Sequence, residues 1–151
     1  KWPSAKVVGY EVSRDAVAYA RQHWRACQFV EGAIEPEAEL AAGPFDVILC
    51  QEFYPFTRTE DYVDHELWLR YVCRNLTSTG IGIITVSSAN QQSLNGTYYS
   101  LKERFELNRM KLAAPRLARR LPFPLSMLTG QLLGCIRPIW ARSVYLVKRG
   151  D

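Results

Sequence analysis

The stretch Lys6–Arg21, KVVGYEVSRDAVAYAR, decides how the rest of the chain is interpreted. Its first part, Lys6–Tyr10, is an apolar, β-branched run with the length of a buried strand. Ser13 follows as a candidate helix N-cap, with helix-forming residues after it. Glu11 stands between the two, at the carboxyl end of the strand. Ligands of open α/β sheets bind beyond such strand ends, and a carboxylate there can accept hydrogen bonds from both hydroxyls of a ribose. Glu11 is therefore the first candidate functional residue.

The size and composition indicate one globular domain. The chain has 151 residues, 48% of them hydrophobic and 23% charged, which suits a single domain with a real core. The sequence contains neither an apolar run of membrane-spanning length nor a signal peptide. It begins with Lys1 and enters a strand almost at once, so we expect the natural amino terminus to lie upstream.

Cysteine usage favours a cytoplasmic protein. Cys27, Cys50, Cys73 and Cys135 form no CxxC pair, and no histidine stands at zinc-ligand spacing from them. Three of them lie in apolar strand or helix patterns, where a free thiol packs as a small hydrophobe. The pattern predicts reduced thiols, as in the cytoplasm, and no metal site.

Positive charge is concentrated in the later half of the chain. Residues 1–75 hold eight Lys and Arg against twelve Asp and Glu, a net of −4, and residues 76–151 hold eleven against three, a net of +8. The densest part, residues 104–120, could contact an anionic substrate, a carrier protein or a membrane surface, or could be a solvated helical face. The basic half lacks the interleaved aromatic residues of a nucleic-acid reader, so a nucleic-acid substrate is not expected.

The rest of the chain repeats the strand-then-helix order of a parallel sheet. Further strands are predicted at residues 27–30, 45–50, 81–86 and 141–148. The second of these is nearly all apolar, which predicts a central strand covered on both faces. A helix beginning at residue 59 or 61 is predicted from apolar-stripe residues that recur at intervals of three and four, namely Tyr62, His65, Leu69, Val72 and Leu76.

Three other segments are less regular. Residues 35–42 are expected to form a short acidic helix or a loop. Residues 94–121 are expected to be helical with an interruption at Pro115, followed by another short helix at 125–133. The run 51–59, QEFYPFTRT, is too aromatic for a plain loop and predicts a pocket wall at the end of the central strand.

The order of these pieces resembles a known family. The segments VVGYEVS, FVEGAIE, FDVILCQEF and LRYVCRNLTSTGIGIITVSS together resemble the latter two-thirds of the core of a class I S-adenosylmethionine-dependent methyltransferase. The closing WARSVYLVKR is similar to the terminal antiparallel strand of that family. The resemblance implies a doubly wound, mostly parallel, Rossmann-like α/β sheet with its core at 1–93 and 134–151 and a helical lid at 94–133. It also implies an enzyme whose cofactor is S-adenosyl-L-methionine.

The resemblance implies specific cofactor contacts. The acid that ends the family's second strand holds the cofactor ribose, which corresponds to Glu11 here. Val12 would then lie beside the adenine, with Ala33 and Ile34 holding its edge through their backbone. Gln51 would contact the methionine or ribose portion.

The chain departs from the family at two points. The family often has Asp after the third strand, whereas Ala33 stands here, and Glu35 is an alternative contact for the adenine. The family's first strand and its GxGxG loop have no counterpart, because Gly9 stands alone and is better explained by strand packing. Either an upstream segment supplies the loop, which we favour, or the chain is a degenerate relative that cannot hold the cofactor.

The reaction implied by the resemblance asks for alignment and, for some acceptors, a base. The methyl group is already activated, so the protein mainly orients the acceptor and excludes water. A hydroxyl or protonated amine must also lose a proton. His65 is the candidate base on pKa grounds, and Glu52 and Tyr54, which follow the central strand, are its rivals. Each also has a structural interpretation: a core histidine, a helix cap and a packing aromatic residue, respectively.

Several residues are candidates for binding the acceptor. Arg58 could bind a carboxylate or phosphate in a bidentate fork, or could pair with Glu60 or Asp61. Asn90, Tyr98 and Tyr99 follow the last parallel strand, where acceptors often dock in the family. Loop hydrogen bonding and helix packing are the alternative roles of these three residues.

The expected activity is methyl transfer to an oxygen or nitrogen atom of a small-molecule, sugar or lipid-like acceptor. The rival from another class is a non-catalytic interaction domain that has lost cofactor binding. A dehydrogenase is a third option, because an acid after the strand also suits a nicotinamide cofactor.

Overall fold

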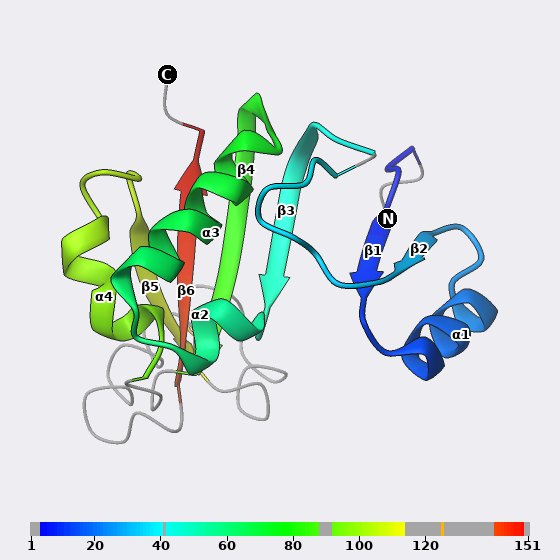
Figure 1. Cartoon of the computed structure of the whole chain (residues 1–151), viewed down its shortest axis with the longest axis horizontal. Coiled ribbons are helices and arrows are strands. Elements are labelled where there is room, and N and C mark those ends of the chain that lie inside the picture. Colours follow the sequence, from blue (N-terminus) through cyan, green and yellow to red (C-terminus); the bar gives the residue numbers. More distant parts are fainter. Residues whose placement is uncertain (1–3, 41, 88–91, 114–124, 126–140, 150–151) are drawn as a thin grey trace. The chain divides into compact units, whose positions relative to one another are not determined.

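A computed structural model describes residues 4–40, 42–87, 92–113, 125 and 141–149. The chain forms two compact units, Lys1–Ala42 and Gly43–Asp151 (Figure 1). In the first unit, β1 (Val8–Glu11) and β2 (Gln28–Glu31) pair in parallel, with α1 (Arg14–His23) between them in sequence. The predicted order of strand, acid and helix is confirmed.

Local chemistry explains the first unit. The Ser13 hydroxyl accepts a hydrogen bond from the N–H of Ala16 at 3.3 Å and caps α1, and Val17 is the buried residue of that helix. A Cβ at Gly9 would lie 2.8 Å from the Phe29 ring, so glycine allows the ring to pack on β1. This close contact confirms the packing interpretation of Gly9.

The second unit is built on a four-stranded sheet in the order β3-β4-β6-β5. Its strands are β3 (Phe45–Gln51), β4 (Leu76–Ser87), β5 (Asn108–Ala113) and β6 (Ala141–Lys148). The β3-β4 pair is parallel, whereas β6 runs antiparallel to both β4 and β5. The expected mostly parallel α/β class and the closing antiparallel strand are confirmed.

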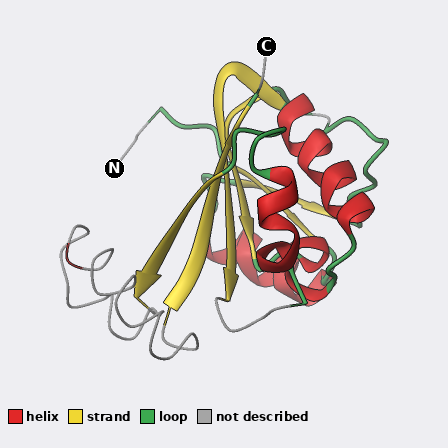
Figure 2. Cartoon of the chain, turned by 90° about the vertical axis from the view of Figure 1, so that its left-hand side faces the viewer, coloured by secondary structure: helices red, strands yellow, loops and turns green. Residues whose placement is uncertain are grey.

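One face of this sheet carries the helices α2 (Tyr54–Arg58), α3 (Tyr62–Arg74) and α4 (Leu94–Leu101), as Figures 1 and 2 show. Asp61 caps α3 by accepting hydrogen bonds from the backbone N–H groups of the first turn. The predicted stripe is confirmed at its centre, because His65, Leu69 and Val72 are buried. They face a core that includes the fully buried Ile84 and Tyr145.

The structure differs from expectation between residues 94 and 121. Helix α4 ends at Leu101, and residues 108–113 form strand β5, so the predicted continuous helix is wrong there. Pairing with β6, which lies far along the sequence, overrides the weak local helix pattern. Most of the expected lid, 114–124 and 126–133, lies outside the described residues.

Strand β3 also differs from the prediction of a strand covered on both faces. Within the described ranges it pairs with β4 alone in its sheet, and Val47 and Leu49 on one face are 49% and 59% exposed. A continuous apolar run makes a strand suitable for burial on both faces. The strand is buried only where other elements of the chain pack against those faces. Residues 35–40 and 42 are turn and irregular backbone, so the loop alternative holds for that part.

Candidate functional site

In the first unit, the carboxyl end of β1 presents an exposed acid followed by an exposed apolar side chain. The Oε1 atom of Glu11 accepts a hydrogen bond from the backbone N–H of Ser13 at 2.9 Å, which orients the carboxylate. Across the described residues, Oε2 of Glu11 has no hydrogen-bond partner. Val12 is 69% exposed, although an isolated valine gains by burial. A carboxylate with one free oxygen beside an apolar surface fits a ribose next to a nucleobase.

The end of β2 adds backbone to this edge. The parallel register places Glu31 beside Glu11, and the N–H of Gly32 donates to the carbonyl of Glu11 at 3.1 Å. Gly32 has φ of 144°, a conformation that other residues rarely adopt, so the chain turns sharply after the strand. Ala33 is exposed and Ile34 half-buried, so both fit the expected nucleobase contact.

In the second unit, the carboxyl end of β3 carries Gln51 and Glu52, both exposed. Glu52 has φ of 51°, in the left-handed region, and its N–H donates to the carbonyl of Thr85 at 3.3 Å. Its Oε1 lies 3.6 Å from Nη2 of Arg142, which comes from β6. The backbone bond and this ion pair hold the Glu52 carboxylate at the strand end.

A pocket of about 380 Å³ opens beside Glu52 and is also lined by Thr57, Arg58 and Gln92. Arg58 makes no ion pair with Glu60 or Asp61 in the part of the chain described, and Asp61 instead caps α3. The guanidinium of Arg58 is therefore available to the pocket. A carboxylate and a guanidinium in one pocket can accept a proton and bind an anionic group, respectively.

The aromatic run 51–59 divides between core and surface. Phe56 is fully buried, and Phe53 packs edge-on against Trp68 with ring centroids 4.9 Å apart. Tyr54 is 65% exposed. The run thus forms helix α2 with Phe56 in the core and Phe53 half-buried before it, and of its aromatic side chains Tyr54 is the exposed one that could face an acceptor.

His65 is a core histidine, contrary to the expected role of base. It is fully buried, and its Nε2 lies 2.9 Å from the carbonyl of Pro55, which can only accept. Nε2 therefore carries the proton, and Nδ1 accepts from the Thr97 hydroxyl at 2.5 Å. Burial lowers the pKa of His65, although the carbonyl of Pro55 and the charge of Asp64 oppose this shift. Its basic nitrogen is occupied and shielded from any acceptor.

The lowered pKa of His65 predicts that stability falls on mild acidification. The unfolded chain takes up a proton near pH 6.5 while the folded chain keeps His65 neutral, so stability is lost as the pH falls below that value. The slope is at most about 1.4 kcal/mol per pH unit for one proton. Urea unfolding between pH 7.5 and 5.5 measures it.

A pair of histidine variants supplies the control for this pH dependence. His65→Gln should unfold more easily at neutral pH and should lose most of the dependence between pH 7.5 and 5.5. His23→Gln removes the other histidine of the chain, which is exposed, and should keep the parent's slope. An unchanged slope in His65→Gln would contradict the assignment.

The remaining acceptor candidates fall into different surroundings. The Tyr98 hydroxyl donates to the carbonyl of Leu107 at 3.4 Å, and the Arg109 guanidinium lies 4.3 Å from the centre of its ring. Tyr98 thus packs structurally, whereas Tyr99 is 68% exposed. Asn90 lies outside the described residues.

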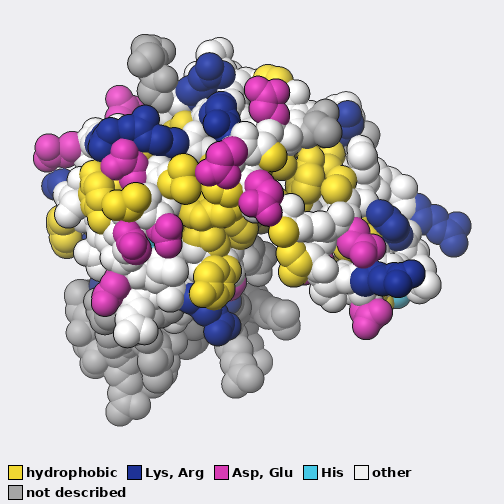
Figure 3. Space-filling model, in the orientation of Figure 1, with side chains coloured by type: hydrophobic (Ala, Val, Ile, Leu, Met, Phe, Trp, Pro, Cys, Tyr) yellow, Lys and Arg dark blue, Asp and Glu magenta, His cyan; other side chains and the backbone are white. Residues whose placement is uncertain are grey.

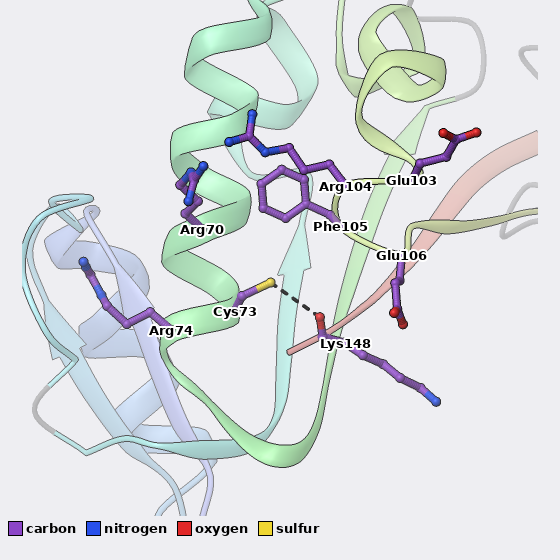
Figure 4. Close-up of a pocket in the computed structure, with 8 residues that line it drawn as sticks. All are labelled: Arg70, Cys73, Arg74, Glu103, Arg104, Phe105, Glu106 and Lys148. Atoms are coloured by element: carbon purple, nitrogen blue, oxygen red, sulfur yellow. Dashed lines mark hydrogen bonds between the residues drawn. The ribbon is translucent and has the colours of Figure 1, made fainter. Parts of the chain in front are cut away.

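A larger pocket of about 740 Å³ lies between the end of α3, residues 103–106 and the end of β6 (Figure 4). Two of its arginines are already engaged, because the Glu66 carboxylate accepts from Nη2 of Arg70 at 2.9 Å and from Nη1 of Arg104 at 2.8 Å. These partners, the Arg70 hydrogen bond above all, lower the pKa of Glu66. Glu103 and Glu106 also line the pocket, so its charges are largely balanced.

Several basic residues of the later half therefore interact with other side chains of the same molecule. Arg104 binds Glu66, Arg109 stacks on Tyr98, and Arg142 approaches Glu52. Figure 3 shows acidic and basic side chains interspersed on the face that carries α3 and α4. This arrangement agrees with the solvated-face alternative for the described part of residues 104–120.

Other sequence expectations concern thiols, metals and membranes. Cys27, Cys50 and Cys73 are free thiols, and burial raises the pKa of Cys50 to about 12, so this thiol is inert. Cys135 lies outside the described residues. Among the residues described, no cluster of His, Cys, Asp and Glu is arranged to bind a metal ion. None of the helices in this part of the chain combines the length and apolar character needed to cross a bilayer.

Sequence reasoning missed two residues around the Glu52 pocket, namely Gln92 and Arg142. Arg142 approaches Glu52 because β6 pairs with the end of β4, where it is the register partner of Ser87. No local motif marks such a residue. Predicting the register of the closing strand is what could have found it.

Solved structures share this fold at low sequence identity. A TehB-like SAM-dependent methyltransferase from Corynebacterium glutamicum is 17% identical with a TM-score of 0.63, over 96% of this chain and 68% of that one. The plantazolicin methyltransferase BpumL, bound to a triazolic desmethylPZN analogue and SAH, is 17% identical with a TM-score of 0.61, over 99% and 69%. A putative methyltransferase from Pseudomonas syringae is 17% identical with a TM-score of 0.55, over 95% and 73%.

The sequence itself also matches a family. No curated protein matches the chain. A family model of a methyltransferase domain, however, matches residues 1–128. The chain therefore belongs to the methyltransferase domain family, which confirms the enzyme class and cofactor expected from the sequence: a methyltransferase that uses S-adenosylmethionine.

Proposed function

We propose that this chain methylates an oxygen or nitrogen atom of a small-molecule, sugar or lipid-like acceptor. The observation that carries the proposal is the placement of an exposed acid at the carboxyl end of a parallel strand in each unit: Glu11 is the last residue of β1, and Glu52 directly follows β3. S-adenosylmethionine, when bound, supplies an activated methyl group. The residues then divide into those that would hold it and those that would handle the acceptor.

On the cofactor side, the first unit offers polar and apolar groups at the ends of β1 and β2. Glu11 would accept hydrogen bonds from the ribose hydroxyls, and the exposed Val12 would cover one face of the adenine. The backbone of Ala33 and Ile34 would meet the adenine edge. Gln51 would bind the methionine or ribose portion.

On the acceptor side, Glu52 and Arg58 have complementary roles. The Glu52 carboxylate would take the proton of a hydroxyl or amine, since it is fixed at the strand end and faces the pocket. Arg58 would bind a carboxylate or phosphate group of the acceptor with its fork of donors. Tyr54 and Tyr99, both largely exposed, would contact the rest of the molecule.

The kind of acceptor is supported by pocket size and by one structural relative. A pocket of about 380 Å³ lies within the range of small-molecule sites. The relative BpumL is bound to a triazolic desmethylPZN analogue. We propose a cytoplasmic location on the basis of the free thiols Cys27, Cys50 and Cys73.

The test of the proposal is calorimetry on the full-length protein with S-adenosylmethionine, S-adenosylhomocysteine and NAD as separate titrants. Binding of the first two, followed by release of S-adenosylhomocysteine with a panel of hydroxyl and amine acceptors, is expected. A full-length protein that binds neither would favour the rival interaction domain. Tighter binding of NAD would favour a dehydrogenase.

A further inference from the structure

We infer that helix α4 positions the acceptor side of the methyl-transfer site, through the polar side chains of Asn95 and Thr97. The inference rests on the proposed function, because the segments that α4 holds are the ones assigned to the acceptor. One of them is 52–58, which follows β3 and lines the pocket. The other is the carboxyl end of β4 at Ser87.

The first connection runs from α4 to α2 through His65. The Thr97 hydroxyl donates to Nδ1 of His65, and Nε2 of His65 donates to the carbonyl of Pro55 in α2. The Thr59 hydroxyl donates to the same carbonyl at 3.0 Å and lies 3.2 Å from Nε2 of His65. Thr97 is only 8% exposed, so a lost partner in this chain is not replaced freely by water.

The second connection runs from α4 to the end of β4 and to the middle of β6. The side-chain amide of Asn95 donates to the carbonyl of Ser87 at 2.9 Å, and its Oδ1 accepts from the Tyr145 hydroxyl at 2.6 Å. Tyr145 is fully buried, and burial raises its pKa, so it remains a hydroxyl donor. Asn95 is thereby held from both sides.

Helix α4 is therefore connected to the segment that follows β3 and to the end of β4. Asn95 and Thr97 both lie in the first half of α4, and the buried Ser93 caps this helix by accepting from the N–H of Asn95. A shift of α4 would disturb the carbonyl of Pro55 and the carbonyl of Ser87 together. Such a shift would disturb the alignment of the acceptor, because reacting atoms must meet within a narrow range of distances and angles.

Two of the residues involved act as positioning residues and not as catalytic ones. His65 and Thr97 point at each other in the interior, so neither reaches the pocket. Their effect on the reaction comes through the placement of Arg58, which α2 carries to the pocket.

The test is Thr97→Val in the full-length protein, with amide hydrogen exchange as the readout that needs no acceptor. Valine keeps the shape of threonine and removes the hydroxyl that His65 requires. We expect amides of 54–59 to exchange about tenfold faster, with exchange in β6 unchanged. Thr97→Ser, which keeps a hydroxyl, should restore the parent rates.

Two further variants separate positioning from general stability. Thr77→Val removes a comparable hydroxyl, which donates to Asp46 at 3.2 Å at the other end of β4, and should leave 54–59 unchanged. Tyr145→Phe removes the donor to Asn95 and should raise exchange at 85–87 more than at 54–59. Faster exchange spread evenly over the second unit in Thr97→Val, or none at 54–59, would overturn the inference.

A binding measurement distinguishes failure of the inference about α4 from failure of the proposed function. With S-adenosylhomocysteine as the probe, Thr97→Val should bind as tightly as the parent, because Glu11 lies in the first unit and Gln51 belongs to β3, ahead of the segment 54–59 that Thr97 holds. Once the panel yields an acceptor, its KM should rise about tenfold in Thr97→Val, with Thr97→Ser close to the parent. If the parent protein does not bind S-adenosylhomocysteine, the proposed function is wrong. The amide hydrogen exchange of residues 54–59 would still decide whether α4 positions that segment.

Discussion

Glu11→Gln is expected to weaken binding of S-adenosylhomocysteine about 100-fold. A hydrogen bond to a charged group contributes about 1.5–3 kcal/mol, and a ribose offers two hydroxyls to one carboxylate. Losing about 2.8 kcal/mol corresponds to a factor of about 100 in the dissociation constant. Glutamine keeps an oxygen that can accept from the N–H of Ser13, so the local turn at Glu11 should persist. Calorimetry with the full-length protein measures the change.

Glu31→Gln is the matched control for this substitution. Glu31 is the register partner of Glu11 at the end of the neighbouring strand and is also exposed. It should change the affinity less than threefold, while both variants keep the parent's melting temperature. Equal effects of the two variants would mean that the general negative charge of this edge matters, and that Glu11 has no specific contact with the ribose.

Glu52→Gln is expected to lower kcat for a hydroxyl or protonated amine acceptor by about 10² to 10⁴, the usual contribution of a positioned base. The amide cannot take the proton, but it has nearly the same shape and can still meet Arg142. The KM of the acceptor should change little, because Arg58 would supply the binding contact. Release of S-adenosylhomocysteine under saturating acceptor measures kcat.

Glu60→Gln removes an equal charge from the exposed loop after α2 and should leave kcat near the parent value. The dependence on pH gives a second check, since the loss in Glu52→Gln should shrink at high pH as the acceptor ionises without help. A variant with full activity at neutral pH would remove Glu52 from the mechanism. Tyr54→Phe would then be the next substitution to test.

The elements that could be predicted from the sequence are those fixed by neighbouring residues. The N-cap at Ser13 and the stripe of α3 depend on contacts within one or two turns of helix, and both are present. Strand β5 could not be predicted, because residues 108–113 become a strand only by pairing with β6. Their own sequence, NRMKLA, is compatible with a helix.

The candidate site divides in the same way. A position at the carboxyl end of a strand, such as Glu11 or Glu52, follows from the strand prediction and from the rule that ligands bind at carboxyl ends. The role of His65 depends on Pro55 and Thr97, which are 10 and 32 residues away in sequence. Residue type and pKa suggested a base, but tertiary contacts determine which nitrogen is free, and here neither is.

The left-handed backbone at Glu52 has a consequence for laboratory evolution of heat resistance. A side chain with a Cβ is disfavoured in this conformation by about 1–2 kcal/mol, whereas glycine adopts it freely. Glycine would also keep the N–H that donates to Thr85. Selection for heat resistance alone should therefore enrich Glu52→Gly. Screens that measure stability but not turnover would then select stable variants that lack the proposed catalytic base.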